Sequence, residues 1–332
     1  MKSIQLKAGE GLDKITLVEQ EISNPATGEI RVRWHATSLN YHDYLVAKGV
    51  LSVPDGRIPM SDGAGVIDAV GTDVTRWKKG DKVMSLFFPN WQHGAPTVAT
   101  TQRISGETTD GYATEYSVLP AHAVTAMPDD YTYVAAATLP CAGLTAWRAL
   151  MVEGQLKPGD SVLIEGTGGM SIFALQFARM AGAQVFATTG SNEKIDQLKA
   201  MGATEVINYK EDPKWGKTLF QKTGGIDHVL DVGGNATMRQ SIEAAKVYGK
   251  IYSIGILGGP KGEILFPKLF FKHLNIIGLA VGSAAMQEAM VKAINANDFQ
   301  PVLDKNFGLE GLKDAFRYQE EGKHFGKITL DY

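Results

Sequence analysis

The chain has 332 residues, more than a single hydrophobic core usually organises, so two domains are expected. Hydrophobic residues make up 44% and charged residues 21%, as in ordinary globular proteins, and the net charge of −3 argues against nucleic acids or anionic membranes as partners. The single cysteine, Cys141, excludes a disulfide within the chain and a zinc site of four cysteines.

The first residues, MKSIQLKAGEGLDKITL, alternate in polarity and lack the apolar core of a signal peptide. No run approaches the roughly 20 apolar residues that a membrane helix needs. We therefore expect a cytoplasmic protein that does not enter a membrane.

Residues 1 to about 120 consist mostly of short alternating or apolar runs between turn residues, which predicts a small β-barrel or sandwich. One segment, NYHDYLVAKG (40–49), instead has helical spacing and ends at Gly49. The predicted strands lie within KITLVEQEI, EIRVRWHATSL, GAGVIDAVG, DKVMSLF and GYATEYSVLP.

From about residue 130 the pattern changes: a helical run, 138–154, is followed by strands that alternate with helices. Such alternation predicts a parallel sheet with helices on both faces, and six strands make two mononucleotide-binding halves. The predicted strands are 161–165, 184–188, 205–208, 227–231, 250–254 and 275–280. The predicted helices are 170–181, 192–201, 213–222, 236–247 and 266–273.

After residue 283 the pattern predicts a helix, a short strand, a second helix over 308–322 and a last strand, GKITLDY. This tail has no place in a six-stranded sheet, so we expect it to return to the first domain.

The motif EGTGGMS (165–171) follows the first strand of the alternating part and opens a helix. Gly166 permits a tight turn, and Gly168 lets a pyrophosphate approach the backbone and the helix N-terminus. Ser171 stands where a third glycine is usual, but it is still small. We predict a dinucleotide site formed by Gly166, Thr167, Gly168, Gly169, Met170 and Ser171.

The end of the second strand bears on which nicotinamide cofactor binds. NAD-binding proteins usually place Asp or Glu there, whereas this chain has TTGS at 188–191. Lys194 follows within one helical turn and Tyr209 comes after the third strand, which favours NADP(H), with Thr189 and Ser191 as further contacts. The competing interpretation makes Ser191 a helix N-cap and Lys194 an ordinary surface lysine.

Later strand ends also carry glycines, in DVGG (231–234), SIGIL (253–257) and GLAVG (278–282). Ligands in open α/β sheets bind beyond the carboxyl ends of the strands. Each segment alone is only a glycine turn, but as a set they predict a lining for the ribose and nicotinamide. The residues expected to form it are Val232, Gly233, Gly255, Ile256 and Gly278.

This order of parts resembles the medium-chain dehydrogenase/reductase family over nearly the whole chain. Residues 61–83 are similar to its first-domain signature, GTGGMS to its cofactor loop, and SLNYHDYLVAKG to the zinc-free, quinone-oxidoreductase-like branch. The resemblance implies an α/β protein with a GroES-like β-barrel-type catalytic domain and a Rossmann domain whose doubly wound parallel sheet has six strands. We place the catalytic domain at 1–125 and 290–332 and the Rossmann domain at 126–289.

The last Rossmann strand, 275–280, would lie at the edge of the sheet, and its apolar sequence would have to be covered or paired. Pairing of two such strands across a two-fold axis, which the resemblance also suggests, predicts a homodimer.

Zinc-dependent members of this family hold the metal with a cysteine, a His–Glu pair and a second cysteine or an acid. By motif, Asn40 stands at the first cysteine position, Ser61–Asp62 at the pair, and Cys141 at the later cysteine position. Because Asn and Ser are poor zinc ligands, we predict no metal and interpret Cys141 as a small buried hydrophobe. His42 and His93 are interpreted as a surface and a loop residue.

Without a metal, oxidation of a simple alcohol needs another electrophile or base, whereas a quinone or α,β-unsaturated carbonyl needs little beyond a hydrogen bond to its oxygen. Asn40 is the first candidate donor, followed by Tyr41, Tyr44 and Ser61, with Asp62 orienting its neighbours.

Three functions stay open: an NADPH-dependent quinone or enone reductase, a metal-free NADP(H)-dependent alcohol or aldehyde oxidoreductase, and a non-enzymatic crystallin-like or RNA-binding protein. The expected partner of the first two is a small carbonyl or quinone substrate. The net charge of −3 argues against the third.

Overall fold

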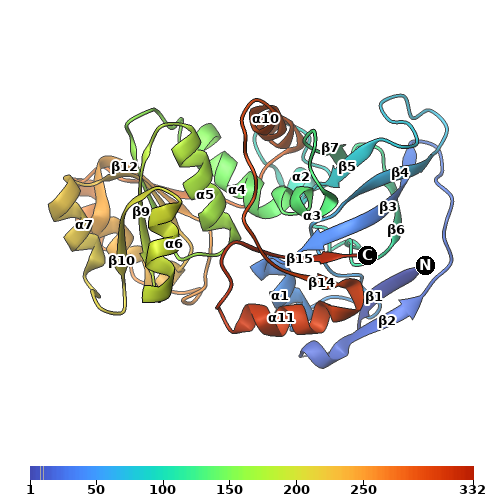
Figure 1. Cartoon of the computed structure of the whole chain (residues 1–332), viewed down its shortest axis with the longest axis horizontal. Coiled ribbons are helices and arrows are strands. Elements are labelled where there is room, and N and C mark those ends of the chain that lie inside the picture. Colours follow the sequence, from blue (N-terminus) through green and yellow to red (C-terminus); the bar gives the residue numbers. More distant parts are fainter. Residues whose placement is uncertain (8, 10) are drawn as a thin grey trace. The chain divides into compact units, whose positions relative to one another are not determined.

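A computed structural model describes residues 1–7, 9 and 11–332 and contains two compact units (Figure 1). Unit 1 comprises Met1–Leu144 and Val281–Tyr332, and unit 2 comprises Thr145–Ala280. These boundaries differ from those that the sequence suggested, 125/126 and 289/290. Tyr133 stacks on His35 at 4.4 Å, and Gln287 donates hydrogen bonds to Ser85 and Thr125, so both flanking segments belong with unit 1.

Unit 2 is built on a parallel sheet with the strand order β10-β9-β8-β11-β12-β13, which confirms the predicted doubly wound fold. The central strands β8, β9 and β11 are mostly buried because helices cover both faces of the sheet (Figure 1). The strands are β8 (Ser161–Glu165), β9 (Gln184–Thr189), β10 (Ala203–Asn208), β11 (Ile226–Asp231), β12 (Ala245–Ser253) and β13 (Asn275–Gly278).

The helices of unit 2 follow the predicted order, although several are shorter than expected. Gly216 allows close packing of α7 on α8, because a Cβ there would lie 2.0 Å from the Gln240 carbonyl oxygen. The helices are α5 (Gly169–Met180), η4 (Asn192–Lys194), α6 (Ile195–Ala200), α7 (Trp215–Thr223), η5 (Gly234–Ala236), α8 (Met238–Ala244) and α9 (Phe266–Phe271).

Unit 1 contains a seven-stranded sheet of order β14-β15-β3-β4-β5-β7, with β6 paired to β3, and a separate β1-β2 hairpin. The C-terminal strands therefore return to unit 1, as predicted; β15 runs antiparallel to β3 (Figure 1). The strands are β1 (Lys2–Leu6), β2 (Ile15–Glu19), β3 (Glu29–Ser38), β4 (Ala64–Val70), β5 (Lys82–Ser85), β6 (Tyr116–Pro120), β7 (Val124–Ala126), β14 (Leu303–Gly308) and β15 (Lys327–Asp331).

The helices of unit 1 are few and short apart from α10 and α11. The amphipathic α11 buries Leu312, Ala315 and Phe316 in a core shared with Ile328 and Leu330 of β15. The helices are η1 (Leu12–Lys14), α1 (Tyr41–Ala47), α2 (Val98–Thr101), α10 (Ala284–Asn295), η6 (Leu309–Gly311) and α11 (Leu312–Glu320).

A continuous helical segment, Tyr133–Glu153, joins α3 (Tyr133–Ala136), η2 (Leu139–Gly143), α4 (Leu144–Trp147) and η3 (Arg148–Glu153), of which η2 and η3 are π-helical. With 21 residues and a mean hydropathy of 1.2, it is long and apolar enough to cross a membrane, which the sequence analysis did not anticipate. Yet 78% of its apolar window is buried inside the protein, as is usual for a core helix.

Candidate active site and cofactor site

The first site lies where β3 ends and α1 begins, in unit 1. Asn40 is the N-cap of α1, and its backbone N–H donates to a carboxylate oxygen of Asp43 at 3.0 Å. The second oxygen of Asp43 accepts a 2.8 Å hydrogen bond from the backbone N–H of Ser61. The buried Asp43 carboxylate thus joins the start of α1 to the segment before β4.

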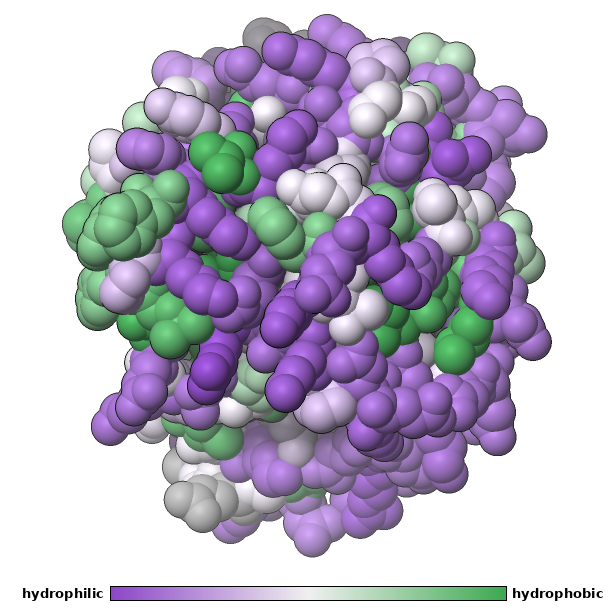
Figure 2. All heavy atoms as spheres, turned by 90° about the vertical axis from the view of Figure 1, so that its left-hand side faces the viewer, coloured by the Kyte–Doolittle hydropathy of each residue, from purple (hydrophilic) through white to green (hydrophobic). Residues whose placement is uncertain are grey.

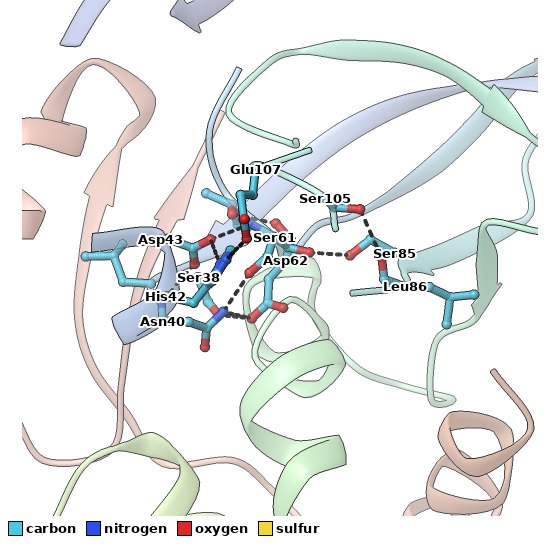
Figure 3. Close-up of polar contacts among 12 residues, drawn as sticks. Ser38, Asn40, His42, Asp43, Ser61, Asp62, Ser85, Leu86, Ser105 and Glu107 are labelled. Carbon is cyan, nitrogen blue, oxygen red and sulfur yellow. Dashed lines mark hydrogen bonds and ion pairs between the residues drawn. The ribbon is translucent and has the colours of Figure 1, made fainter. Parts of the chain in front are cut away.

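Asp62 lies at the centre of this buried cluster (Figure 3). One carboxylate oxygen accepts hydrogen bonds of 2.8 Å from Ser38 Oγ and from Asn40 Nδ2, and Lys327 Nζ is 3.7 Å from it. The other oxygen, Oδ1, has no hydrogen-bond partner among the described residues. Burial raises the pKa of Asp62 to about 6, although the Lys327 charge acts in the opposite direction.

The side-chain amide of Asn40 is fully engaged. Its two N–H groups donate to Asp62 at 2.8 Å and to Ser61 Oγ at 3.2 Å, and its oxygen accepts from Lys327 Nζ at 2.6 Å. The amide therefore has no free N–H for a substrate, which corrects our first choice of donor. In the described part of the chain Ser61 uses its oxygen as an acceptor while no acceptor is found for its own hydroxyl hydrogen.

Tyr44 lies apart from this cluster, contrary to the prediction that it donates to the substrate. Its ring packs against Phe316, and its hydroxyl donates to Glu320 at 2.5 Å and accepts from Lys48 at 2.6 Å. Tyr44 therefore joins α1 to α11. Tyr41 is 38% exposed and stacks on Tyr44.

His42, which we had interpreted as a surface histidine, is largely buried in the cluster (Figure 3). Its Nε2 is 2.7 Å from Glu107, and Phe87 contacts the ring edge-on. Its Nδ1 is 3.8 Å from Asp43 and has no hydrogen-bond partner in the part of the chain that the structure describes. Burial opposes the charged form, but Asp43 and Glu107 together raise the pKa of His42 above its usual value. His93, in contrast, is an exposed loop residue, as expected.

The side chains at the mapped ligand positions are poorly suited to zinc. Asn40 donates hydrogen bonds to Ser61 and Asp62, and the Lys327 ammonium lies beside Asn40 and Asp62. Desolvation, with the nearby Asp62 charge, raises the pKa of the Cys141 thiol, which disfavours the thiolate that zinc binds. Cys141 is only partly buried, less than predicted. Among the described residues no group of three His, Cys, Asp or Glu side chains is placed to hold a metal.

The second site lies at the carboxyl end of β8 in unit 2, where the predicted glycine loop begins. Gly166 has a φ of 73°, which glycine adopts without strain, and Gly168 is the N-cap of the 12-residue α5. Ser171 is buried, and its hydroxyl donates to the Glu165 carbonyl oxygen at 2.7 Å. It therefore joins α5 to β8 at the position where a third glycine is usual. The N-terminus of α5 is thus presented as in proteins that bind a pyrophosphate.

The residues expected around a 2′-phosphate come together beside this loop. Lys194 Nζ donates to Thr167 Oγ1 at 3.1 Å, and the Tyr209 hydroxyl lies so close to Gly190 that a Cβ there would be 2.5 Å away. Ser191 occupies the N-cap position of η4, but its side chain makes no capping bond.

Two further charges lie near the end of β9, and the sequence analysis did not include them. The Lys210 side chain also approaches Gly190, at 3.1 Å from the same Cβ position. The nearby carboxylate of Glu211 accepts hydrogen bonds from Asn192 at 2.5 Å and from Asn208 at 3.4 Å. The Glu211 carboxylate is therefore hydrogen-bonded to two side-chain amides. It does not occupy the end of β9, where NAD-binding proteins usually have an acidic residue.

A buried pair of carboxyl groups lies under the glycine loop. The Ser241 hydroxyl is 2.8 Å from Glu165 and 2.7 Å from Asp231, and Glu165 also accepts the backbone N–H groups of Val232 and Gly233. Burial and mutual repulsion raise the pKa of Glu165, and burial raises that of Asp231. The signal of this pair in the sequence is an acidic residue at the end of each of two apolar strands, Glu165 and Asp231.

The other predicted cofactor contacts occupy the carboxyl ends of β11, β12 and β13. Gly255 lies against the backbone of Val232, where a Cβ would be 2.6 Å from the carbonyl oxygen. Ile256 is 46% exposed, and nothing lies within 4 Å of a Cβ on Gly278. The predicted set thus borders one edge of the parallel sheet, where ligands of such sheets bind.

Comparison with known proteins agrees with this geometry. Residues 26–129 match the family model of the alcohol dehydrogenase GroES-like domain, and residues 169–296 match that of zinc-binding dehydrogenases. A zinc-type alcohol dehydrogenase-like protein of Schizosaccharomyces pombe is 42% identical, over 96% of both chains. The chain belongs to the medium-chain dehydrogenase/reductase family.

Other members of the medium-chain family share the fold along the whole chain. An alcohol dehydrogenase of Geobacillus stearothermophilus is 32% identical over 96% of both chains. A solved NAD-dependent alcohol dehydrogenase is 31% identical with a TM-score of 0.91, and 100% of each chain is covered. A mycobacterial structure complexed with NADPH, 24% identical with a TM-score of 0.84 over 100% of both chains, shares the fold. The protein is accordingly an oxidoreductase of this family.

Proposed function

We propose that this protein is a zinc-independent oxidoreductase that transfers hydride from NADPH to a quinone or an α,β-unsaturated carbonyl. The observation that carries the proposal is the buried cluster of Asn40, Ser61 and Asp62. Asn40 donates hydrogen bonds to Ser61 and Asp62 and accepts one from Lys327. This cluster leaves the Ser61 hydroxyl hydrogen for an acceptor oxygen, but it offers no set of soft ligands to zinc.

The preference for NADP(H) rests on this chain's own residues, since one 31%-identical relative is described as NAD-dependent. Lys194 and Tyr209 lie beside the glycine loop, Lys210 adds a second cation, and β9 ends in Thr189 without a carboxylate. A 2′-phosphate would gain charge-assisted hydrogen bonds at this position.

The proposed chemistry assigns a part to each group of unit 1. The nicotinamide supplies the hydride when it is bound. Ser61 has an uncommitted hydroxyl hydrogen for the acceptor oxygen, and Asn40 and Asp43 fix the position of Ser61 from either side. The charged form of His42, which Asp43 and Glu107 favour, is a proton source close to this cluster.

The direct test is a comparison of substrates with the purified protein after chelator treatment. We expect reduction of quinones and enones with NADPH, clearly faster than oxidation of simple secondary alcohols with NADP⁺, and tighter binding of NADPH than of NADH. One tightly held zinc per chain, lost together with activity on chelation, would overturn zinc independence.

A metal-free alcohol or aldehyde oxidoreductase is the second candidate, because the named relatives are alcohol dehydrogenases or resemble them. The His42–Glu107 pair favours this second candidate, because the neutral form of His42 is a base that can accept the proton of an alcohol. Rapid alcohol oxidation by metal-free protein, without quinone or enone reduction, would select this candidate. No observation favours a non-enzymatic role.

A further inference from the structure

Lys327 is a buried lysine whose ammonium lies beside Asn40 and Asp62, two residues at the mapped zinc-ligand positions. It is the first residue of β15 and is 3% exposed. Its Nζ donates to the Leu39 carbonyl oxygen and to Asn40 Oδ1, both at 2.6 Å, and lies 3.7 Å from Asp62 Oδ2. Pairing of Thr329 with Ser38 holds β15 beside β3 and fixes the lysine in this position.

Lysine is among the residues that are least often fully buried, because its ammonium loses hydration that only charges and good acceptors replace. Here the three oxygens replace that hydration. The same three contacts put a positive charge against the residues that occupy the mapped ligand positions, Asn40 and Asp62. An apolar residue at 327 would leave Asp62 without a counter-charge and the oxygen of Asn40 without a donor.

We propose that Lys327 is the resident cation of this site and takes the electrostatic place that a metal ion holds in zinc-binding members of the family. This inference rests on the proposed zinc independence and adds a residue to it. Lys327 acts as a positioning residue: its bond to Asn40 Oδ1 orients the amide so that both N–H groups face Asp62 and Ser61. The hydroxyl hydrogen of Ser61 is thereby left for the acceptor oxygen.

The first experiment asks whether Lys327 excludes zinc. The variant Asn40→Cys/Ser61→His supplies soft ligands next to Asp62 and Cys141, and it is compared with the same variant carrying Lys327→Met. Charge repulsion should weaken zinc binding, measured by competition with a chromophoric chelator, at least tenfold while Lys327 is present. Equal zinc affinities of the two proteins would show that the ammonium does not occupy the metal's electrostatic place.

The second experiment separates positioning from simple stabilisation. Lys327→Met should lower turnover about 10²-fold and lower Tm, with the Kd of NADPH within about twofold. The double variant Lys327→Met/Asp62→Asn removes both charges, so we expect Tm to recover while turnover stays low. If turnover recovers together with Tm, Lys327 is only a structural partner of Asp62.

The control is Lys323→Met, which removes an exposed lysine just before β15 and should change neither turnover nor Tm. A wild-type protein that reduces no quinone or enone would refute the proposed substrate class alone. The zinc comparison and the turnover of the variants with the acceptor that the wild type does use would still decide the role of Lys327.

Discussion

Asn40 and Tyr44 were both predicted to be donors, and the structure gives them different environments. Asn40 is buried with its amide bonded to Ser61, Asp62 and Lys327, whereas the Tyr44 hydroxyl bonds to Glu320 and Lys48. We expect Asn40→Ala to reduce turnover by about 10- to 10²-fold with little change in NADPH affinity, because Ser61 loses its orientation. Tyr44→Phe is the matched control and should keep wild-type turnover; steady-state kinetics and NADPH titration measure both.

A substitution of Lys194 tests whether the protein prefers NADPH to NADH. Loss of a charge-assisted phosphate contact typically costs about 1.5 to 3 kcal/mol, so Lys194→Ala should weaken NADPH binding roughly tenfold or more and leave NADH binding nearly unchanged. Fluorescence titration with both cofactors gives the two dissociation constants. A similar loss for both would mean that Lys194 acts through Thr167 and the glycine loop rather than on the 2′-phosphate.

Glu165 makes stability depend on pH. Its pKa is raised in the folded protein, so above the usual carboxyl range the folded state holds more protons than the unfolded state, and stability falls as pH rises through the raised pKa. Glu165→Gln keeps an acceptor for Val232 and Gly233 but removes the proton. Between the usual carboxyl range and the raised pKa of Glu165, the free energy of unfolding of the variant should rise relative to that of wild type by about 1 kcal/mol per pH unit.

Urea unfolding at about pH 5 and about pH 8 measures this difference. Glu193→Gln, on the exposed surface of the same unit, is the control and should leave the pH dependence unchanged. If Glu165→Gln shows the same pH dependence as wild type, the buried carboxyl pair does not hold the extra proton.

At the scale of secondary-structure elements, the contact between α7 and α8 depends on a glycine. A Cβ on Gly216 would lie 2.0 Å from the Gln240 carbonyl oxygen, a backbone atom that cannot move without α8. Gly216→Ala should lower the free energy of unfolding by about 1 to 2 kcal/mol, since overpacking outweighs the gain in helix propensity. Gly308→Ala, where a Cβ meets nothing within 4 Å, should be nearly neutral in the same denaturation experiment.

At the scale of the whole molecule, the open edge of the unit 2 sheet bears on assembly. β13 is the edge strand, and α9 just before it exposes three phenylalanines, Phe266, Phe270 and Phe271. Figure 2 shows hydrophobic side chains gathered in places on a mostly hydrophilic face. Since apolar edges are usually covered or paired, we propose that two copies pair through this region.

Light scattering at micromolar concentration should give the mass of a dimer. Phe271 is 76% exposed, so Phe271→Glu disturbs little within the chain and should shift the mass towards the monomer. Val98→Glu changes a residue that is 80% exposed in unit 1 and should leave the mass unchanged. A wild-type monomer would refute the homodimer.

The sequence by itself determined the six-stranded parallel sheet and the place of the glycine loop. Ser161–Glu165 was located to the residue, because an apolar run bounded by Pro-Gly-Asp and by glycines has one plausible start and end. The predicted cofactor contacts depend on equally local signals, since they follow the ends of recognisable strands. Short or weakly patterned elements such as β1, β7 and α2 were missed, because three to five residues carry too little periodicity.

Only the tertiary structure decided what the polar residues do. Lys327 lies 287 positions after Asn40 in the chain, and only the pairing of β15 with β3 brings its ammonium to the amide. Tyr44 and Asn40 are neighbours in sequence, yet the turn of α1 directs one to α11 and the other to Asp62. Hydrogen bonds and desolvation act between groups that are close in space, and sequence patterns report only on groups that are close along the chain.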